Sequence, residues 1–105
     1  MPIKKYDKMI VHIVFFKFKE EQKKENQAKA TNMLLSLLEK VPTLKFIEVG
    51  ENFSNEDRAM DLSIITHFDS LEDLQIYAIH PEHLKVVDFI KQVVEYSKVV
   101  DYETN

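Results

Sequence analysis

"MIVHIVFFKF", residues 9–18, decides the fold of this chain. The stretch is rich in β-branched and aromatic residues and is too short to be anything but a buried strand. Because side chains alternate across a strand, its residues form two sets, and both sets are largely apolar. One set is Met9, Val11, Ile13 and Phe15, and the other is Ile10, His12, Val14 and Phe16. A sheet that contains this strand therefore has two faces to cover.

After this strand the apolar residues take the three- and four-residue spacing of a helix. The helix is predicted over residues 20–40, and Pro42 ends it. Its apolar stripe is Ala30, Met33, Leu34, Leu37, Leu38 and Val41. A second strand is predicted at 44–53, where Gly50 allows a bulge or a close backbone approach, followed by a polar loop at 54–58.

The second half of the chain is predicted to contain a third strand, two helices and a closing edge strand. Asp69 or Ser70 can cap the first of these helices, and Pro81 both ends it and suits the first position of the next. The apolar stripe of the second helix is Leu84, Val87, Ile90 and Val94. The predicted bounds are 60–68 for the strand, 71–79 and 82–95 for the helices, and 98–102 for the edge strand.

The predicted order of elements is β-α-β-β-α-β, the split arrangement of the ferredoxin-like α+β fold. Right-handed crossovers place both helical layers on the same side of a four-stranded sheet. A chain of 105 residues suits one domain, predicted over residues 9–105. Residues 1–8 are predicted to be a flexible N-terminal tail.

One copy of the chain cannot cover both faces of this sheet. The helices cover one face, so the row Val11, Ile13 and Phe15 would stay in water, and such a patch exceeds what monomers usually expose. A second identical sheet can cover the row, because a two-fold interface uses one surface twice. We therefore predict a homodimer with its sheets face to face, a dimeric α/β barrel.

The histidine of the first strand decides which face meets the helices. His12 can reach Tyr77 and His83 only if its set points toward the helices. The same alternation places one row of the third strand beneath the helices, namely Leu62, Ile64 and Thr66. It places the more polar row in the space between the two sheets, namely Asp61, Ser63, Ile65 and His67.

Composition and charge argue against several classes of partner. The chain has 14 basic and 18 acidic residues and a net charge of −4, with the two signs interleaved. Neither nucleic acid nor a membrane is therefore a favoured partner. The absence of cysteine excludes disulfides, thiolate chemistry and Cys-ligated zinc, and it suits a cytoplasmic protein.

The segment "QIYAIHPEHLKVV", residues 75–87, concentrates the groups able to do chemistry. A histidine can transfer a proton near neutral pH, and a tyrosine hydroxyl can donate to a carbonyl that gains charge as an enolate forms. Tyr77 and His83 would then be a catalytic pair for a small carbonyl compound, with no cofactor. In the alternative interpretation Tyr77 buries its ring in the core and His83 faces solvent in a first helical turn.

The other two histidines have structural interpretations as well. His12 on an apolar strand is a satisfied core histidine unless it lies near Tyr77. His80 ends a helix beside Pro81, where an imidazole can bond to unpaired carbonyls. His80 and His83 have a spacing sometimes used for metal, but the proline breaks their common face, and a third ligand such as His12 or Asp61 would be needed. We therefore predict no metal site.

Four segments together resemble the stress-responsive dimeric α/β-barrel (Dabb) domain family: "HIVFFKFK", "IEVGENFS", "FDSLEDLQIYAIHPEH" and "VVDY". The resemblance spans almost the whole chain and implies a ferredoxin-like protomer and a homodimeric barrel. One plant member is a cofactor-free polyketide cyclase, and its catalytic tyrosine and histidine fall on Tyr77 and His83. One of its pocket histidines falls on His12, whereas a histidine of its third strand falls on Leu62, so the polar side of that pocket is not reproduced.

These residues support three hypotheses of function. In the first, the homodimer binds a small apolar or carbonyl-containing molecule between sheet and helices. In the second, it is a cofactor-free acid–base enzyme that catalyses aldol cyclisation or isomerisation with Tyr77 and His83. The third, a haem-handling monooxygenase, is not expected, and we predict no cofactor. The predicted ligand-binding residues are His12, Val14, Phe16, Ile64, Thr66 and His80.

Overall fold

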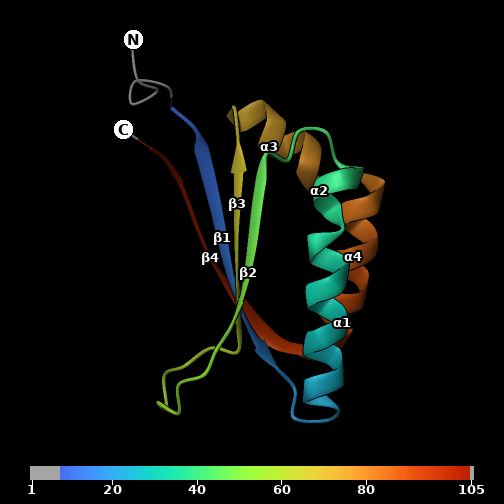
Figure 1. The fold of residues 1–105 in the computed structure, drawn as a ribbon, viewed down its shortest axis with the longest axis vertical. Coiled ribbons are helices and arrows are strands. Elements are labelled where there is room, and N and C mark those ends of the chain that lie inside the picture. Colours follow the sequence, from blue (N-terminus) through green and yellow to red (C-terminus); the bar gives the residue numbers. More distant parts are fainter. Residues whose placement is uncertain (1–7, 105) are drawn as a thin grey trace.

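The computed structural model describes residues 8–104 and has two layers, a four-stranded sheet and a set of helices on one of its faces (Figure 1). In chain order the elements are β1 (Ile10–Phe18), α1 (Lys23–Leu35), α2 (Leu37–Lys40), β2 (Phe46–Glu51), β3 (Leu62–Phe68), α3 (Leu71–Ala78), α4 (Pro81–Val93) and β4 (Val94–Glu103). The sheet is antiparallel, in the order β2-β3-β1-β4. The ferredoxin-like α+β fold is thus confirmed. The predicted tail at residues 1–8 lies outside the described residues, except for Lys8.

The core forms where one face of the sheet meets α1, α2 and α4. Phe18 and Phe68 are fully buried on the two central strands. Leu37 of α2 and Val41, directly after α2, belong to the same core cluster. Each buried side chain of this size contributes about 2–3 kcal/mol. The register of β1 against β3 places His12, Val14 and Phe16 opposite Thr66, Ile64 and Leu62 on this face. The predicted orientation of both strands is therefore confirmed.

The helices differ from the predicted ones in where they begin and end and in which residues face the core. α1 begins at Lys23 because Gln22 takes a left-handed conformation with φ 51°. It ends before Ser36, whose hydroxyl donates to the carbonyl of Met33 at 2.7 Å. In α4 the inward row contains Val86 and Ile90, whereas Leu84 is 46% exposed. The predicted stripes were therefore wrong at Leu84 and also at Leu38, which is 45% exposed.

The last strand is longer than predicted. Residues 98–102 were expected, but β4 runs over ten residues, Val94–Glu103, and starts directly after α4. It pairs with the whole length of β1, with one register shift between Lys17 and Phe18. β4 remains at the edge of the sheet, as predicted.

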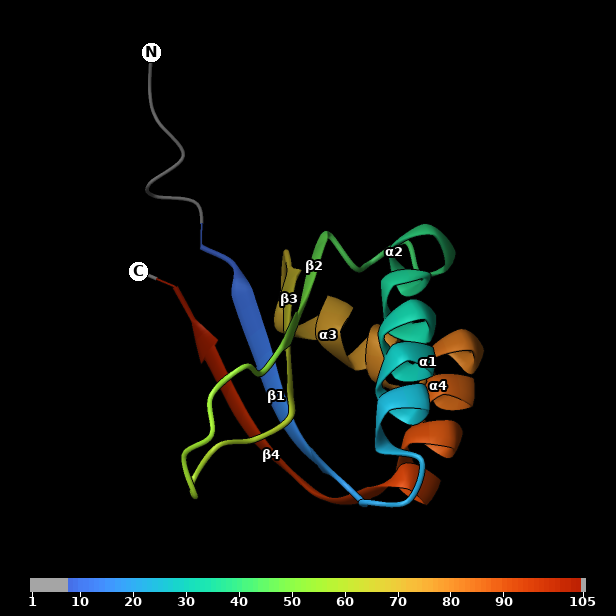
Figure 2. The ribbon, with the colours of Figure 1, turned by 60° about the horizontal axis from the view of Figure 1, so that its bottom comes forward.

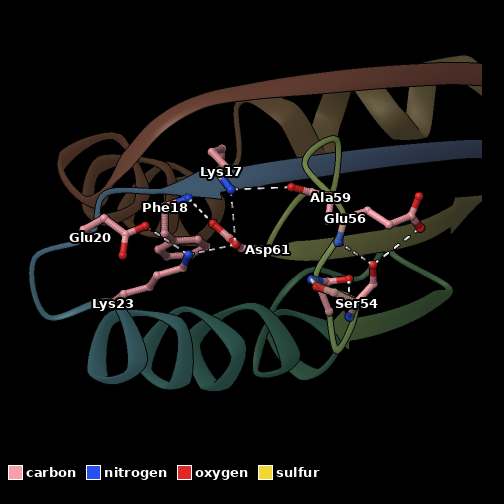
Figure 3. A network of polar contacts seen from close by, with 9 residues as sticks. Lys17, Phe18, Glu20, Lys23, Ser54, Glu56, Ala59 and Asp61 are labelled. Carbon is pink, nitrogen blue, oxygen red and sulfur yellow. Dashed lines mark hydrogen bonds and ion pairs between the residues drawn. The ribbon is translucent and has the colours of Figure 1, made fainter.

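Asp61 has a different place from the one predicted between two sheets. It lies just before β3, is 8% exposed, and its carboxylate accepts a hydrogen bond from the amide of Phe18 at 2.7 Å (Figure 3). The same carboxylate pairs with Nζ of Lys23 at 3.0 Å and lies 3.8 Å from Nζ of Lys17. The side chain turns inward at the strand end because it satisfies a backbone donor there, and it connects β1 to the start of α1.

Within residues 8–104, the second face of the sheet carries no helix (Figure 2). Register and alternation place on it one row from each strand, which we call the open face: Val11, Ile13, Phe15, Phe46, Glu48, Ser63, Ile65, His67, Tyr96, Lys98, Val100 and Tyr102. Val100 is 50% exposed, Tyr102 47% and Phe46 39%, whereas Val11 is only 3% exposed. The uncovered apolar surface is therefore centred on β4 and β2 as much as on β1. Among residues 8–104, no helix is long and apolar enough to cross a membrane.

Candidate functional site

A cavity of about 240 Å³ lies between the sheet and the helices. Among the polar residues that line it are His12 from β1, Tyr77 from α3 and His83 from α4, together with Lys91 of α4 and Ser97 of β4. Its walls are mostly apolar and include Val14, Phe16, Leu34, Ile64, Val86 and Ile90. A few polar groups in an apolar hollow are the usual composition of a small-molecule site.

Tyr77 lies in the last turn of α3, whose start is fixed by a cap. The hydroxyl of Ser70 accepts a hydrogen bond from the amide of Asp73 at 3.1 Å, as the sequence predicted for a cap at Asp69 or Ser70. The Tyr77 ring packs against Phe68 with centroids 4.9 Å apart and is 3% exposed. Burial raises the pKa of the Tyr77 hydroxyl far above its usual value. The Tyr77 hydroxyl therefore stays protonated at neutral pH and can donate a hydrogen bond.

His83 lies in the first turn of α4, directly beside Tyr77. Its Nδ1 is 3.1 Å from the carbonyl oxygen of Ala78, and because a carbonyl only accepts, we assign the ring proton to Nδ1. Burial lowers the pKa of His83; the carbonyl of Ala78 opposes this, and the nearby imidazoles of His12 and His80 lower it further. The ring is therefore neutral at pH 7, and Nε2 is the nitrogen that can accept a proton.

His12 has a carboxylate partner that the sequence did not reveal. Its Nδ1 forms a hydrogen bond with the side chain of Asp101, which lies directly opposite on β4. The carboxylate orients the imidazole and holds a proton on Nδ1. The pair is formed across two strands far apart in the chain, so the only available signal was the register of β1 against β4.

The structure brings together six of the predicted site residues and leaves two apart. His12, Val14, Phe16, Ile64, Tyr77 and His83 line the same cavity. Thr66 does not line it: its side chain is buried and donates to the carbonyl of His12 at 3.0 Å. His80 does not line it either. The cavity residues that sequence reasoning missed include Leu34, Val86 and Ile90, which were assigned only to helix cores or to no stripe.

His80 instead caps α4. Its Nδ1 accepts a hydrogen bond from the amide of Glu82 at 3.1 Å, and Pro81 takes the first helical position. The structural role expected at this helix end is present, but the partner is an amide of the next helix rather than carbonyls of the preceding one. The cap fixes where α4 starts and so where His83 lies relative to Tyr77.

The alternative metal ligands are not assembled. Within residues 8–104, no group of three or more His, Asp or Glu side chains is placed to hold a metal ion. His80 bonds its own helix, and Asp61 is engaged by Lys23 next to α1. The site therefore combines the Tyr77 hydroxyl and two imidazoles with mostly apolar walls, and Lys91 and Ser97 add polar groups to its lining.

Comparison with known proteins gives consistent matches over nearly the whole chain. The family model described as "Stress responsive A/B Barrel Domain" matches residues 10–104. Olivetolic acid cyclase from Cannabis sativa is 24% identical over 95 residues, which cover 89% of this chain and 94% of the cyclase.

Two solved structures show the same fold. A dimeric protein of unknown function with a ferredoxin-like fold from Bacteroides fragilis superposes with a TM-score of 0.75 at 31% identity, covering 90% of this chain and 95% of that one. A hydroxynitrile lyase from Passiflora edulis superposes with a TM-score of 0.84 at 21% identity, covering 94% and 95%. At the latter identity the likeness concerns the fold alone.

Proposed function

The chain belongs to the stress-responsive A/B barrel (Dabb) domain family, and we propose that it is a homodimer in which each protomer binds a small apolar or carbonyl-containing molecule. The binding site is the cavity between sheet and helices. The observation that carries this proposal is that Tyr77, His83 and His12 converge on a hollow with apolar walls. Apolar walls hold the body of a ligand, and the few polar groups orient its oxygen.

The homodimer is supported by the open face. Its residues Val100, Tyr102 and Phe46 are 39–50% exposed, and no helix of the described part of the chain lies on this face. Large contiguous apolar patches on one protomer usually mark an interface. The Bacteroides fragilis structure, at 31% identity, is of a dimeric protein. A second copy placed sheet to sheet covers this face in both protomers at once.

A second candidate function, cofactor-free acid–base catalysis, is favoured by the pairing of Tyr77 with His83. In such a reaction, Nε2 of His83 takes a proton from the carbon next to a substrate carbonyl. The Tyr77 hydroxyl donates a hydrogen bond to the carbonyl oxygen, where the negative charge of the enolate develops. In aldol cyclisation the enolate carbon attacks a second carbonyl of the same molecule, and the alkoxide that forms takes the proton back from His83. In isomerisation His83 returns the proton to the enolate at a different carbon.

Binding in the cavity is tested by a substitution on α4 that places a larger side chain in it. Val87 lines the cavity, whereas Leu84, one turn earlier on the same helix, is 46% exposed and does not. With 2-octanone as the probe in ligand-observed NMR, Val87→Phe is expected to weaken binding by about ten-fold or more, equal to 1.4 kcal/mol. Leu84→Phe is the matched control and is expected to leave the affinity unchanged. Equal affinities for all three proteins would contradict binding in this cavity.

A further inference from the structure

The loop between β2 and β3, residues 52–61, holds an aromatic side chain entirely in solvent. Phe53 is 98% exposed, more than any other large apolar residue of the described part of the chain. A scattered exposed apolar residue needs no explanation, but a fully exposed ring on a fixed loop does. We call residues 52–61 the β2–β3 arm.

The arm is held by its own hydrogen bonds on both sides of Phe53. Its base is closed by the amide of Asn52, which donates to the carbonyl of Asp61 at 3.0 Å. The side chain of Asn52 donates to the carbonyl of Ser54 at 2.7 Å and accepts from its amide at 3.1 Å. The hydroxyl of Ser54 accepts from the amide of Glu56 at 3.1 Å (Figure 3). The ring of Phe53 is thus presented by a preorganised backbone.

The base of the arm is also fastened to the sheet and to α1. Asp61 accepts from the amide of Phe18 and pairs with Lys23, and Nζ of Lys17 donates to the carbonyl of Ala59 at 3.5 Å. These contacts fix the direction in which the arm leaves the sheet. In both ribbon views the arm swings to the side of the sheet away from the helices, which is the side of the open face (Figures 1 and 2).

A hollow lies between the arm and the open face. It has a volume of about 410 Å³, and Phe15, Gly50, Phe53, Met60 and Ser63 are among the residues that line it. Gly50 contributes no side chain there, and an added Cβ would come within 3.1 Å of the Ser63 hydroxyl. Whatever covers the open face must therefore fit beneath or against the arm.

We propose that the β2–β3 arm is a clasp for the second copy of the chain, with Phe53 buried against the partner's open face. This inference rests on the proposed homodimer and adds the residue that anchors it. A second copy is the occupant because it alone covers an apolar face in both molecules, and because two-fold symmetry gives each interface two arms. A rigid aromatic side chain that becomes fully desolvated at an interface is the usual chemistry of a binding hot spot.

The first test is the strength of the dimer. Phe53→Ser is expected to raise the dimer dissociation constant by about 30-fold or more, measured by sedimentation over a dilution series. Ile79→Ser is the matched control, because Ile79 is 73% exposed but lies at the end of α3, on the helical side. It should leave the dissociation constant unchanged.

The second test reports the surroundings of position 53 directly and does not depend on the stability of a truncated variant. The chain contains no tryptophan, so Phe53→Trp introduces a single fluorophore. Its emission is expected to be blue-shifted in the dimer and to move to the red on dilution, with the same midpoint as in sedimentation. Ile79→Trp should emit as a solvent-exposed indole throughout.

The possible outcomes distinguish a failure of the clasp from a failure of the proposed homodimer. A wild-type chain that sediments as a monomer at all concentrations would overturn the homodimer and the clasp together. A stable dimer in which Phe53→Ser leaves the dissociation constant unchanged, or in which Phe53→Trp emits as an exposed indole, would overturn the clasp alone.

Discussion

The imidazole of His83 lies against the ring of Tyr77, with the two centroids 4.2 Å apart. The two residues come from different helices, the last turn of α3 and the first turn of α4. The junction between them is short because His80 caps α4 and Pro81 begins it. A protonated phenol and a neutral imidazole are thereby held side by side at one cavity. The proposed acid–base chemistry depends on this arrangement.

Removal of either member of the pair is expected to slow enolisation strongly. With 2-octanone in deuterated water, the rate of exchange of the hydrogens next to the carbonyl reports proton abstraction. His83→Ala and Tyr77→Phe should each lower the enzyme-dependent rate by about 10²- to 10⁴-fold. Leu84→Ala, on the exposed side of α4, is the control. Wild-type rates in both variants would leave ligand binding as the only function of the site.

The protonation of His83 should be coupled to stability with a defined sign. Burial lowers its pKa in the folded chain below the ordinary value of 6.5. The unfolded chain therefore binds the proton more readily, so protonation favours unfolding. The contribution of neutral His83 is complete above pH 6.5 and is lost as the pH falls through the lower folded pKa. The melting temperature of the wild type should fall more steeply below pH 6.5 than that of His83→Gln.

An NMR titration of the His83 ring measures its pKa in the folded chain directly. A midpoint below 6.5 is expected, and a midpoint at or above 6.5 would contradict burial as the dominant influence on this ring.

Asp101 is expected to act on the orientation of His12 rather than on overall stability. Its side chain is 50% exposed, so the loss of the pair in Asp101→Ala should change the free energy of unfolding by less than about 1 kcal/mol. The tautomer of His12 should change, because nothing would then hold the proton on Nδ1. Nitrogen chemical shifts of the ring report the tautomer. An unchanged Nδ1–H tautomer in this variant would show that the carboxylate does not orient the ring.

Asp61 is expected to matter far more for folding than its position before β3 suggests. Asp61→Ala leaves the amide of Phe18 without its partner and removes the ion pair with Lys23. The free energy of unfolding should fall by about 2–3 kcal/mol in urea denaturation. Asp57→Ala, in the exposed part of the same arm, should change it by less than about 0.5 kcal/mol. Equal effects of the two changes would show that the contacts of Asp61 with Phe18 and Lys23 do not stabilise the fold.

The sequence predicted the fold because the strongest signals were local. The composition of residues 9–18 indicates a strand that is buried on both faces, and the position of His12 decides which face meets the helices. The positions of Ser70 and Pro81 at helix starts were also predictable, since caps and helix-first prolines act through neighbouring backbone groups.

What the sequence could not specify depends on contacts between distant segments. Leu84 and Val86 are both compatible with an apolar stripe, and only packing against the sheet selects Val86. The pairing of His12 with Asp101 required the register of β1 against β4. Asp61 alternates with the open-face row, yet it turns inward because an unpaired amide of the neighbouring strand lies within reach. In each case tertiary structure chose between alternatives that were locally equivalent.

The most direct test of the central claim is where a ligand binds in relation to the two faces of the sheet. Neighbouring strand residues report opposite faces: Val14 and Ile64 line the cavity, whereas Ile13 and Ile65 belong to the open face. We expect a titration of methyl-labelled protein with 2-octanone to shift the methyl signals of Val14, Ile64 and Val86 and to leave those of Ile13 and Ile65 in place. Shifts confined to Ile13 and Ile65, or no shifts at saturating ligand, would contradict a binding site between sheet and helices.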